Sequence, residues 1–210
     1  MEIIARNLAE LHEKAVYYVL RFGTKGKTED GEAVITAPPV SFIVEDPTKG
    51  RQVSDWNNFK GTALVNYVDE VLYGTKSRFV YDYHDRLFKD PCNQIEACIK
   101  RINHDLRTRR AVAHTWIPEV DNDRKDVPCL QYIQFWVDEN RLNMFVLFRS
   151  NDVLSALGAN TIALTALQTQ VACACKLVMG SYTHSIVIPH IYYKRDANLL
   201  MEATTNKIEW

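Results

Sequence analysis

Two spacings of apolar residues alternate along the chain, and together they predict both helices and strands. An apolar residue every three to four positions is typical of an amphipathic helix, and it predicts helices over 2–22, 62–73, 92–106 and 159–179, with a last helix from about 196 to the end. Short apolar runs bounded by turn residues predict strands at 40–44, 111–116, 130–137, 142–148 and 186–193. Because these elements follow one another without a regular strand–helix–strand alternation, we expect an α+β fold in which one large mixed sheet is flanked by helices.

The residues between these elements refine the prediction. Gly23 and Gly74 are expected to end the first two helices, since glycine is common just past a helix. The polar stretch 25–32 is expected to be a loop, and the run at 111–116 is apolar enough for an inner strand. The pattern over 159–179 is almost entirely apolar or small, so we expect one long helix that is buried on several sides.

The strands at 130–137 and 142–148 are separated by a short polar turn, which predicts a hairpin. Cys129 stands at the start of the first strand and Arg149 at the end of the second, so the hairpin places a thiol opposite a cation. A cysteine reacts as its thiolate, and nearby positive charge makes the thiolate easier to form. The pair therefore suits a nucleophile that meets an anionic substrate. The alternative is that Cys129 is a small buried hydrophobe, as a lone cysteine among aliphatic residues usually is.

Composition and charge favour a globular protein and argue against nucleic-acid-binding and membrane proteins. The chain has 210 residues, of which 47% are hydrophobic and 24% charged, and this fits a single globular domain over 1–210. The formal net charge of −1 argues against a broad nucleic-acid-binding surface, although it leaves room for a local phosphate pocket. No apolar run reaches the roughly 18 residues of a membrane span, and the N-terminus lacks the pattern of a signal peptide. We therefore expect a cytoplasmic protein with no membrane or nucleic-acid partner.

The cysteines point in the same direction. They form an odd set without a regular framework, which favours reduced thiols, and their spacing does not match a usual zinc site, so we expect no metal. They are Cys92, Cys98, Cys129, Cys173 and Cys175.

Several motifs beyond the hairpin share one order and spacing with a known family. Pro128-Cys129 is followed by Arg149-Ser150-x-Asp152, then by Asn160 eight positions later, and then by His190-x-Tyr192; Arg109-Arg110 precedes them. From Tyr81 to Tyr193 the chain resembles thymidylate synthase, particularly the short archaeal-type enzymes. The first 75 residues fit this pattern only loosely.

The resemblance implies a role for each motif at the nucleotide. Cys129 would add to C6 of the pyrimidine, and Tyr81 would help to remove the proton from C5. Arg149 and Ser150 would bind the phosphate, since a guanidinium and a hydroxyl suit phosphate oxygens. Arg109 and Arg110 would reach the same phosphate from the partner chain of a homodimer.

The remaining motifs would read the base, the sugar and the folate. Asn160 would donate to O4 and accept from N3–H, which matches the uracil of dUMP. His190 and Tyr192, two apart on a strand and so on the same side, would bind the ribose hydroxyl. Asp152 would bind the pterin ring; its alternative role is to cap the helix that follows.

The activity implied is that of a methyltransferase in dTMP biosynthesis: reductive methylation of dUMP with 5,10-methylene-tetrahydrofolate or a methanopterin analogue as co-substrate. Two alternatives stay open, a pyrimidine nucleotide hydroxymethylase and a non-catalytic dimeric nucleotide-binding protein. They stay open because the sequence departs from the family pattern. Leu130 replaces the usual histidine after the nucleophile, only Arg21 and the segment 23–27 are available as a phosphate loop, and the C-terminal lid is not recognisable.

Overall fold

A mixed β-sheet forms the centre of the computed structural model, which describes residues 1–74, 82–89 and 91–205. Within these residues the sheet has eight strands. Six follow one another in the spatial order β1 (Glu2–Ala5), β4 (Val40–Val44), β8 (Val178–Ile191), β7 (Arg141–Asp152), β6 (Leu130–Asp138) and β5 (Val112–His114). The hairpin of β2 (Thr24–Lys27) and β3 (Ala33–Thr36) joins this sheet through β8. The pairs β1–β4 and β7–β8 are parallel and the others antiparallel, so the predicted α+β class with one large mixed sheet is confirmed.

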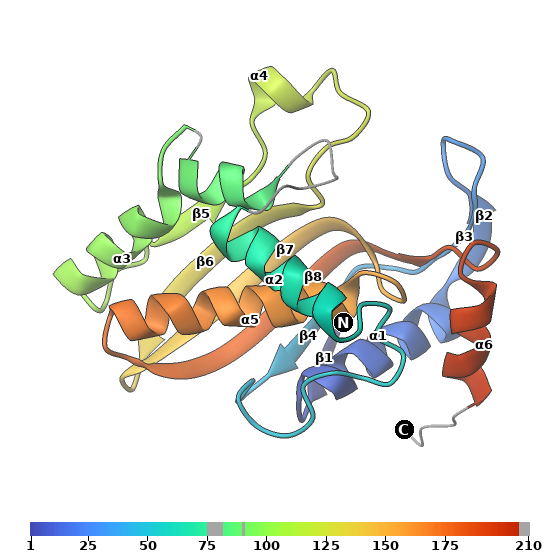
Figure 1. Ribbon diagram of the computed structural model, residues 1–210, viewed down its shortest axis with the longest axis horizontal. Helices are drawn as coiled ribbons and strands as arrows, with labels where there is room; N and C mark the ends of the chain where they lie inside the picture. The colour runs from blue at the N-terminus through green and yellow to red at the C-terminus, as the bar shows by residue number, and fades with distance from the viewer. Residues whose placement is uncertain (75–81, 90, 206–210) are drawn as a thin grey trace.

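The main helices lie on one face of this sheet (Figure 1). They are α1 (Leu8–Phe22), α3 (Gln94–His104) and α5 (Leu157–Ala174), with α2 (Thr62–Tyr73) stacked on α5. Alternate residues of β7, such as Met144 and Val146, point to this side and are fully buried. The helix α5 is buried along most of its length, as its apolar composition predicted.

Three shorter helical segments complete the chain: the π-helical turn η1 (Asp85–Lys89), α4 (Pro118–Asp121) and the C-terminal α6 (Ala197–Thr205). The turn η1 is held by a buried ion pair in which Arg86 Nη2 lies 2.8 Å from Asp121 Oδ1. Among the described helices, none is long and apolar enough to cross a membrane.

The elements with the clearest local signals were predicted correctly. The strand at 40–44 and the helix at 62–73 have the predicted bounds, and Gly74 ends that helix with a φ of 69°. The β6–β7 hairpin turns through Glu139 and Asn140, whose φ angles are 43° and 61°.

Other boundaries were wrong because tertiary pairing decided them. Residues 2–5 form the strand β1 rather than the first turn of a helix, since they pair with β4, and α1 begins only after the cap at Asn7. The expected loop 25–32 is largely the β2–β3 hairpin. The strand near 111–116 lies at the edge of the sheet, and the long helix ends at Ala174, before β8.

Candidate active site

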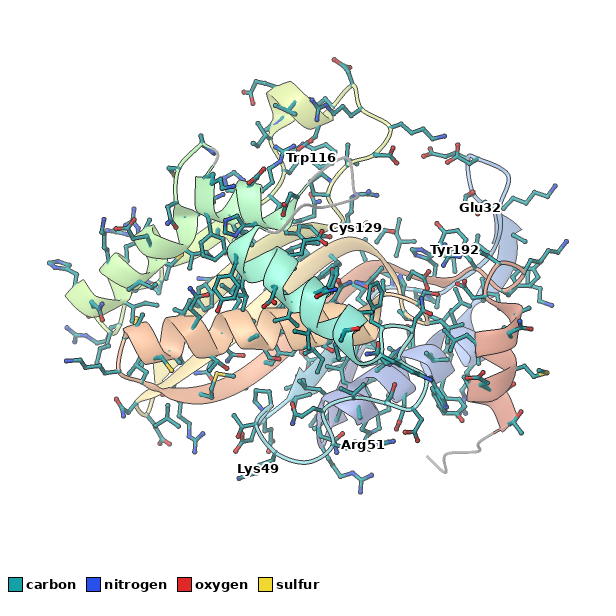
Figure 2. The ribbon with its side chains drawn as sticks, viewed as in Figure 1. Glu32, Lys49, Arg51, Trp116, Cys129 and Tyr192 are labelled. Carbon is teal, nitrogen blue, oxygen red and sulfur yellow. The ribbon has the colours of Figure 1, made fainter. Side chains whose placement is uncertain are left out.

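A cavity of about 490 Å³ opens beside the ends of β7 and β8. Its wall combines the turn between β2 and β3, the helix α2, the start of the β6–β7 hairpin and the start of α5. In Figure 2, Cys129, Glu32 and Tyr192 lie toward the same part of the molecule. Seven of the residues predicted from sequence line this one cavity: Cys129, Arg149, Ser150, Asp152, Asn160, His190 and Tyr192.

The predicted pair of a thiol and a cation is present at the mouth of the hairpin. The Arg149 backbone N–H donates to the Cys129 carbonyl at 2.9 Å, which fixes the register of the two residues. The Arg149 guanidinium donates to the carbonyls of Pro128 and Val127 at 2.9 and 2.8 Å, and its Nη2 lies 3.7 Å from Cys129 Sγ. The half-buried sulfur therefore sits beside the guanidinium of Arg149, which its two hydrogen bonds to backbone carbonyls hold in place.

Asn160 lies in the first turns of α5 and is only 7% exposed. Its backbone is fixed by the helix, and its side-chain Oδ1 accepts a hydrogen bond of 2.5 Å from the Tyr67 hydroxyl. Tyr67 belongs to α2 and also lines the cavity, so the two helices present one hydrogen-bonded pair to a ligand.

His190 presents a hydrogen-bond acceptor to the cavity. Its Nδ1 lies 3.1 Å from the carbonyl of Ile188, and because a carbonyl only accepts, Nδ1 carries the proton. Burial lowers the pKa of His190 below its usual 6.5, so the ring is neutral at pH 7 and Nε2 keeps a free lone pair. Burial raises the pKa of Tyr192, whose hydroxyl therefore remains a donor. A neutral imidazole and a phenol side by side suit an uncharged hydroxyl group.

Asp152 is held at the wall of the cavity by hydrogen bonds and an ion pair. Its Oδ1 accepts from the backbone N–H groups of Leu154 and Ser155 at 3.2 and 3.1 Å, in the turn before α5; the N-cap of α5 is Ala156, which has no side-chain cap, so the alternative role as a helix cap was wrong. Its Oδ2 forms an ion pair with Arg195, whose guanidinium also lies 4.2 Å from the centre of the Tyr192 ring. Asp152 lines the cavity, so the turn and the ion pair hold a carboxylate in place at its wall.

Arg109 and Arg110 are not among the residues that line the cavity. Both are exposed and precede the edge strand β5, so this chain alone does not bring them to the other predicted residues. Tyr81 lies outside the described residues. Arg21 and the segment 23–27 do not line the cavity either; the turn that follows contributes Thr28 and three carboxylates, Glu29, Asp30 and Glu32.

Several further residues line the cavity without having been predicted as site residues, and four of them have polar side chains close to predicted ones or to the cavity: Tyr67, Glu70, Tyr83 and Arg195. The Tyr83 hydroxyl accepts from the Leu130 N–H at 3.1 Å, one residue from Cys129, and Tyr67 holds Asn160. Of the two adjacent acidic residues of α2, Asp69 and Glu70, only Glu70 lines the cavity. Arg195 forms the ion pair with Asp152 described above. Tyr83 lies two residues after Tyr81, the tyrosine that the sequence motifs indicated.

Residues 46–208 match the family model described as "Thymidylate synthase", so the match includes every predicted site residue. The chain belongs to the thymidylate synthase family. It is 42% identical over 200 residues to a Methanocaldococcus jannaschii protein named "Putative thymidylate synthase", a match that covers 90% of each chain. A Methanopyrus kandleri protein of the same name is 36% identical over 189 residues, which cover 89% of this chain and 90% of the relative. A Methanococcoides burtonii protein of that name is 29% identical over 195 residues, which cover 90% of this chain and 88% of the relative. The thymidylate synthase motifs thus lie on a chain that is similar to archaeal relatives over nearly its whole length.

Proposed function

We propose that this protein is a thymidylate synthase that converts dUMP to dTMP with a reduced folate as co-substrate. One observation carries the proposal: a single cavity joins the Cys129–Arg149 pair to Asn160 and to the His190–Tyr192 pair. The three groups match one deoxyuridine nucleotide. The Cys129 sulfur suits the electrophilic C6, the Asn160 amide suits the O4–N3 edge of the base, and the acceptor and donor of His190 and Tyr192 suit the ribose hydroxyl.

In this reaction the Cys129 thiolate adds to C6, and C5 becomes an enolate-like carbon nucleophile. C5 then forms a bond to the methylene carbon of the folate as the bond from that carbon to N10 breaks and N10 takes up a proton, and the C5 proton leaves to a base. The pterin nitrogen departs with the bonding electrons, and the resulting tetrahydro-pterin returns a hydride to the exocyclic methylene. Cys129 is released as the methyl group forms, so the products are dTMP and dihydrofolate. The chain's own contribution is to hold the reactants in line and to stabilise charge at O4 through Asn160.

The working unit of the proposal is a homodimer. The sheet face opposite the helices has alternating half-buried residues of β6 and β7, among them Tyr132, Trp136, Phe145 and Leu147, and no described helix packs on it. An apolar sheet face of this kind suits a symmetric partner. A second copy on this face could supply Arg109 and Arg110, which the cavity of one chain lacks.

The function is tested by incubating the purified protein with 5-tritiated dUMP and methylene-tetrahydrofolate. We expect tritium release to water together with an equal amount of dihydrofolate, measured by its absorbance. Tritium release with hydroxymethyl-dUMP and no dihydrofolate would instead identify a hydroxymethylase. Binding of dUMP without any tritium release, with either tetrahydrofolate or methanopterin carriers, would identify a non-catalytic binding protein.

Tyr83 is proposed as the tyrosine that helps to remove the C5 proton, alongside the earlier candidate Tyr81. Its hydroxyl accepts from the backbone N–H of Leu130, the residue after Cys129, and Tyr83 lines the cavity, where an acid–base group would have to lie. We expect Tyr83→Phe to lower kcat by about 10- to 100-fold with little change in the KM for dUMP. Steady-state tritium release from Tyr83→Phe and Tyr81→Phe, compared side by side, checks this. A large loss in Tyr81→Phe alone would return the role to Tyr81.

A further inference from the structure

We propose that Tyr67 is a positioning residue that fixes the orientation of the Asn160 amide and thereby sets the preference for uracil over cytosine. This inference rests on the proposed function, because it concerns how the same cavity reads the base. It assigns a specificity role to a helix, α2, that carried none of the residues in the sequence motifs.

The distance between the two side chains selects one orientation of the amide. The Tyr67 hydroxyl oxygen lies 2.5 Å from Asn160 Oδ1. Such a separation falls within the range of O–H···O hydrogen bonds, which extends down to about 2.5 Å, but below the range of N–H···O bonds, which begins at about 2.7 Å. A flipped amide would place Nδ2 at this short distance, so the tyrosine would have to move away. The contact therefore favours Oδ1 on the Tyr67 side.

The packing around Tyr67 opposes that movement. Its ring lies 5.2 Å from the ring of Phe59, at an angle of 47°. The helix α2, which carries Tyr67, packs on α5, which carries Asn160. In the part of the chain that the structure describes, Nδ2 of Asn160 has no hydrogen-bond partner, so this end of the amide is available to a ligand.

The orientation matters because uracil and cytosine present opposite patterns at positions 3 and 4. Uracil offers a donor at N3–H and an acceptor at O4, and an amide matches it with Oδ1 toward N3–H and Nδ2 toward O4. Cytosine offers an acceptor at N3 and a donor at N4, and the same amide matches it after a flip. An unconstrained asparagine can read both bases. With Tyr67 donating to one lone pair of Oδ1, the second lone pair can accept from N3–H. The flip needed for cytosine replaces this short O–H···O bond with an N–H···O contact, for which the packed tyrosine has to move away.

The test compares dUMP and dCMP binding by calorimetry in the wild-type protein, in Tyr67→Phe and in Tyr73→Phe. Tyr73→Phe is a matched control, because Tyr73 lies on the same helix, is 66% exposed and does not line the cavity. We expect Tyr67→Phe to reduce the ratio of the dCMP to the dUMP dissociation constant by about tenfold, the effect of one hydrogen bond. Tyr73→Phe should leave the ratio unchanged. A purely structural role of Tyr67 would weaken both nucleotides equally and would overturn the inference.

A second background shows whether Tyr67 acts through the amide. An aspartate at position 160 has two equivalent oxygens, so there is no amide to orient. In Asn160→Asp, the further change Tyr67→Phe should alter the ratio by less than about twofold. A tenfold change in this background as well would overturn the inference. Failure of the wild-type protein to bind dUMP at all would instead refute the proposed function, which separates the two failures.

Discussion

Replacing Cys129 with serine is expected to lower kcat by at least about a thousandfold while the dissociation constant of dUMP changes by less than about threefold. A serine hydroxyl does not ionise at neutral pH and is a much weaker nucleophile than a thiol, so the position beside Arg149 loses the proposed nucleophile. The other contacts proposed for the nucleotide are unaffected, because Asn160, His190 and Tyr192 come from other elements. Tritium release and calorimetry measure the two quantities separately.

The control for this prediction is Cys173→Ser. Cys173 is an exposed free cysteine near the end of α5 and does not line the cavity, so the same chemical change there should leave kcat unchanged. A Cys129→Ser protein that retained more than about a tenth of the wild-type kcat would contradict covalent catalysis by this residue. Equal losses in the two variants would point to damage from thiol removal in general.

The site residues that local sequence could place lie on one hairpin, near one strand end and at one helix start. Cys129 and Arg149 meet because a short turn joins two strands whose alternation was readable, and the register then follows. His190 lies near the end of a strand, and Asn160 lies in the first turns of a helix with a clear apolar pattern. For these residues the spacing in sequence already fixed the place in the fold.

Contacts between distant segments could not be read in this way. Tyr67 reaches Asn160 from a position 93 residues earlier, and this depends on α2 packing over α5. The strand β1 has apolar residues that also fit a helix, and only its pairing with β4 distinguishes the two. The π-helical turn η1, which follows Tyr83 closely, likewise had no local signal in the sequence.

Arg109 and Arg110 offer the sharpest prediction about assembly. Both are exposed and outside the cavity of their own chain, although the family motif connects them with the nucleotide phosphate. If each site takes them from the partner, the double variant Arg109→Ala/Arg110→Ala should lose at least about a hundredfold in kcat/KM, as expected when two charged contacts to phosphate are removed. Gel filtration should still show a dimer, because the apolar residues of the sheet face, Tyr132, Trp136, Phe145 and Leu147, are unchanged in this variant.

Mixing this variant with Cys129→Ser distinguishes a shared site from a site within one chain. Each parent dimer is defective in both sites, but a mixed dimer contains one site with Cys129 from one chain and both arginines from the other. Random exchange of subunits at equal concentrations makes half of the dimers mixed, each with one intact site of two, so about a quarter of the wild-type activity should return.

Exchange is started by dilution from mild denaturant, and tritium release is followed with time. Recovery requires that the arginines act across the interface, since an arginine pair serving its own chain would leave every site in the mixture defective. A mixture that stays as inactive as its parents, with mixed dimers demonstrated by mass spectrometry, would therefore exclude the partner's contribution.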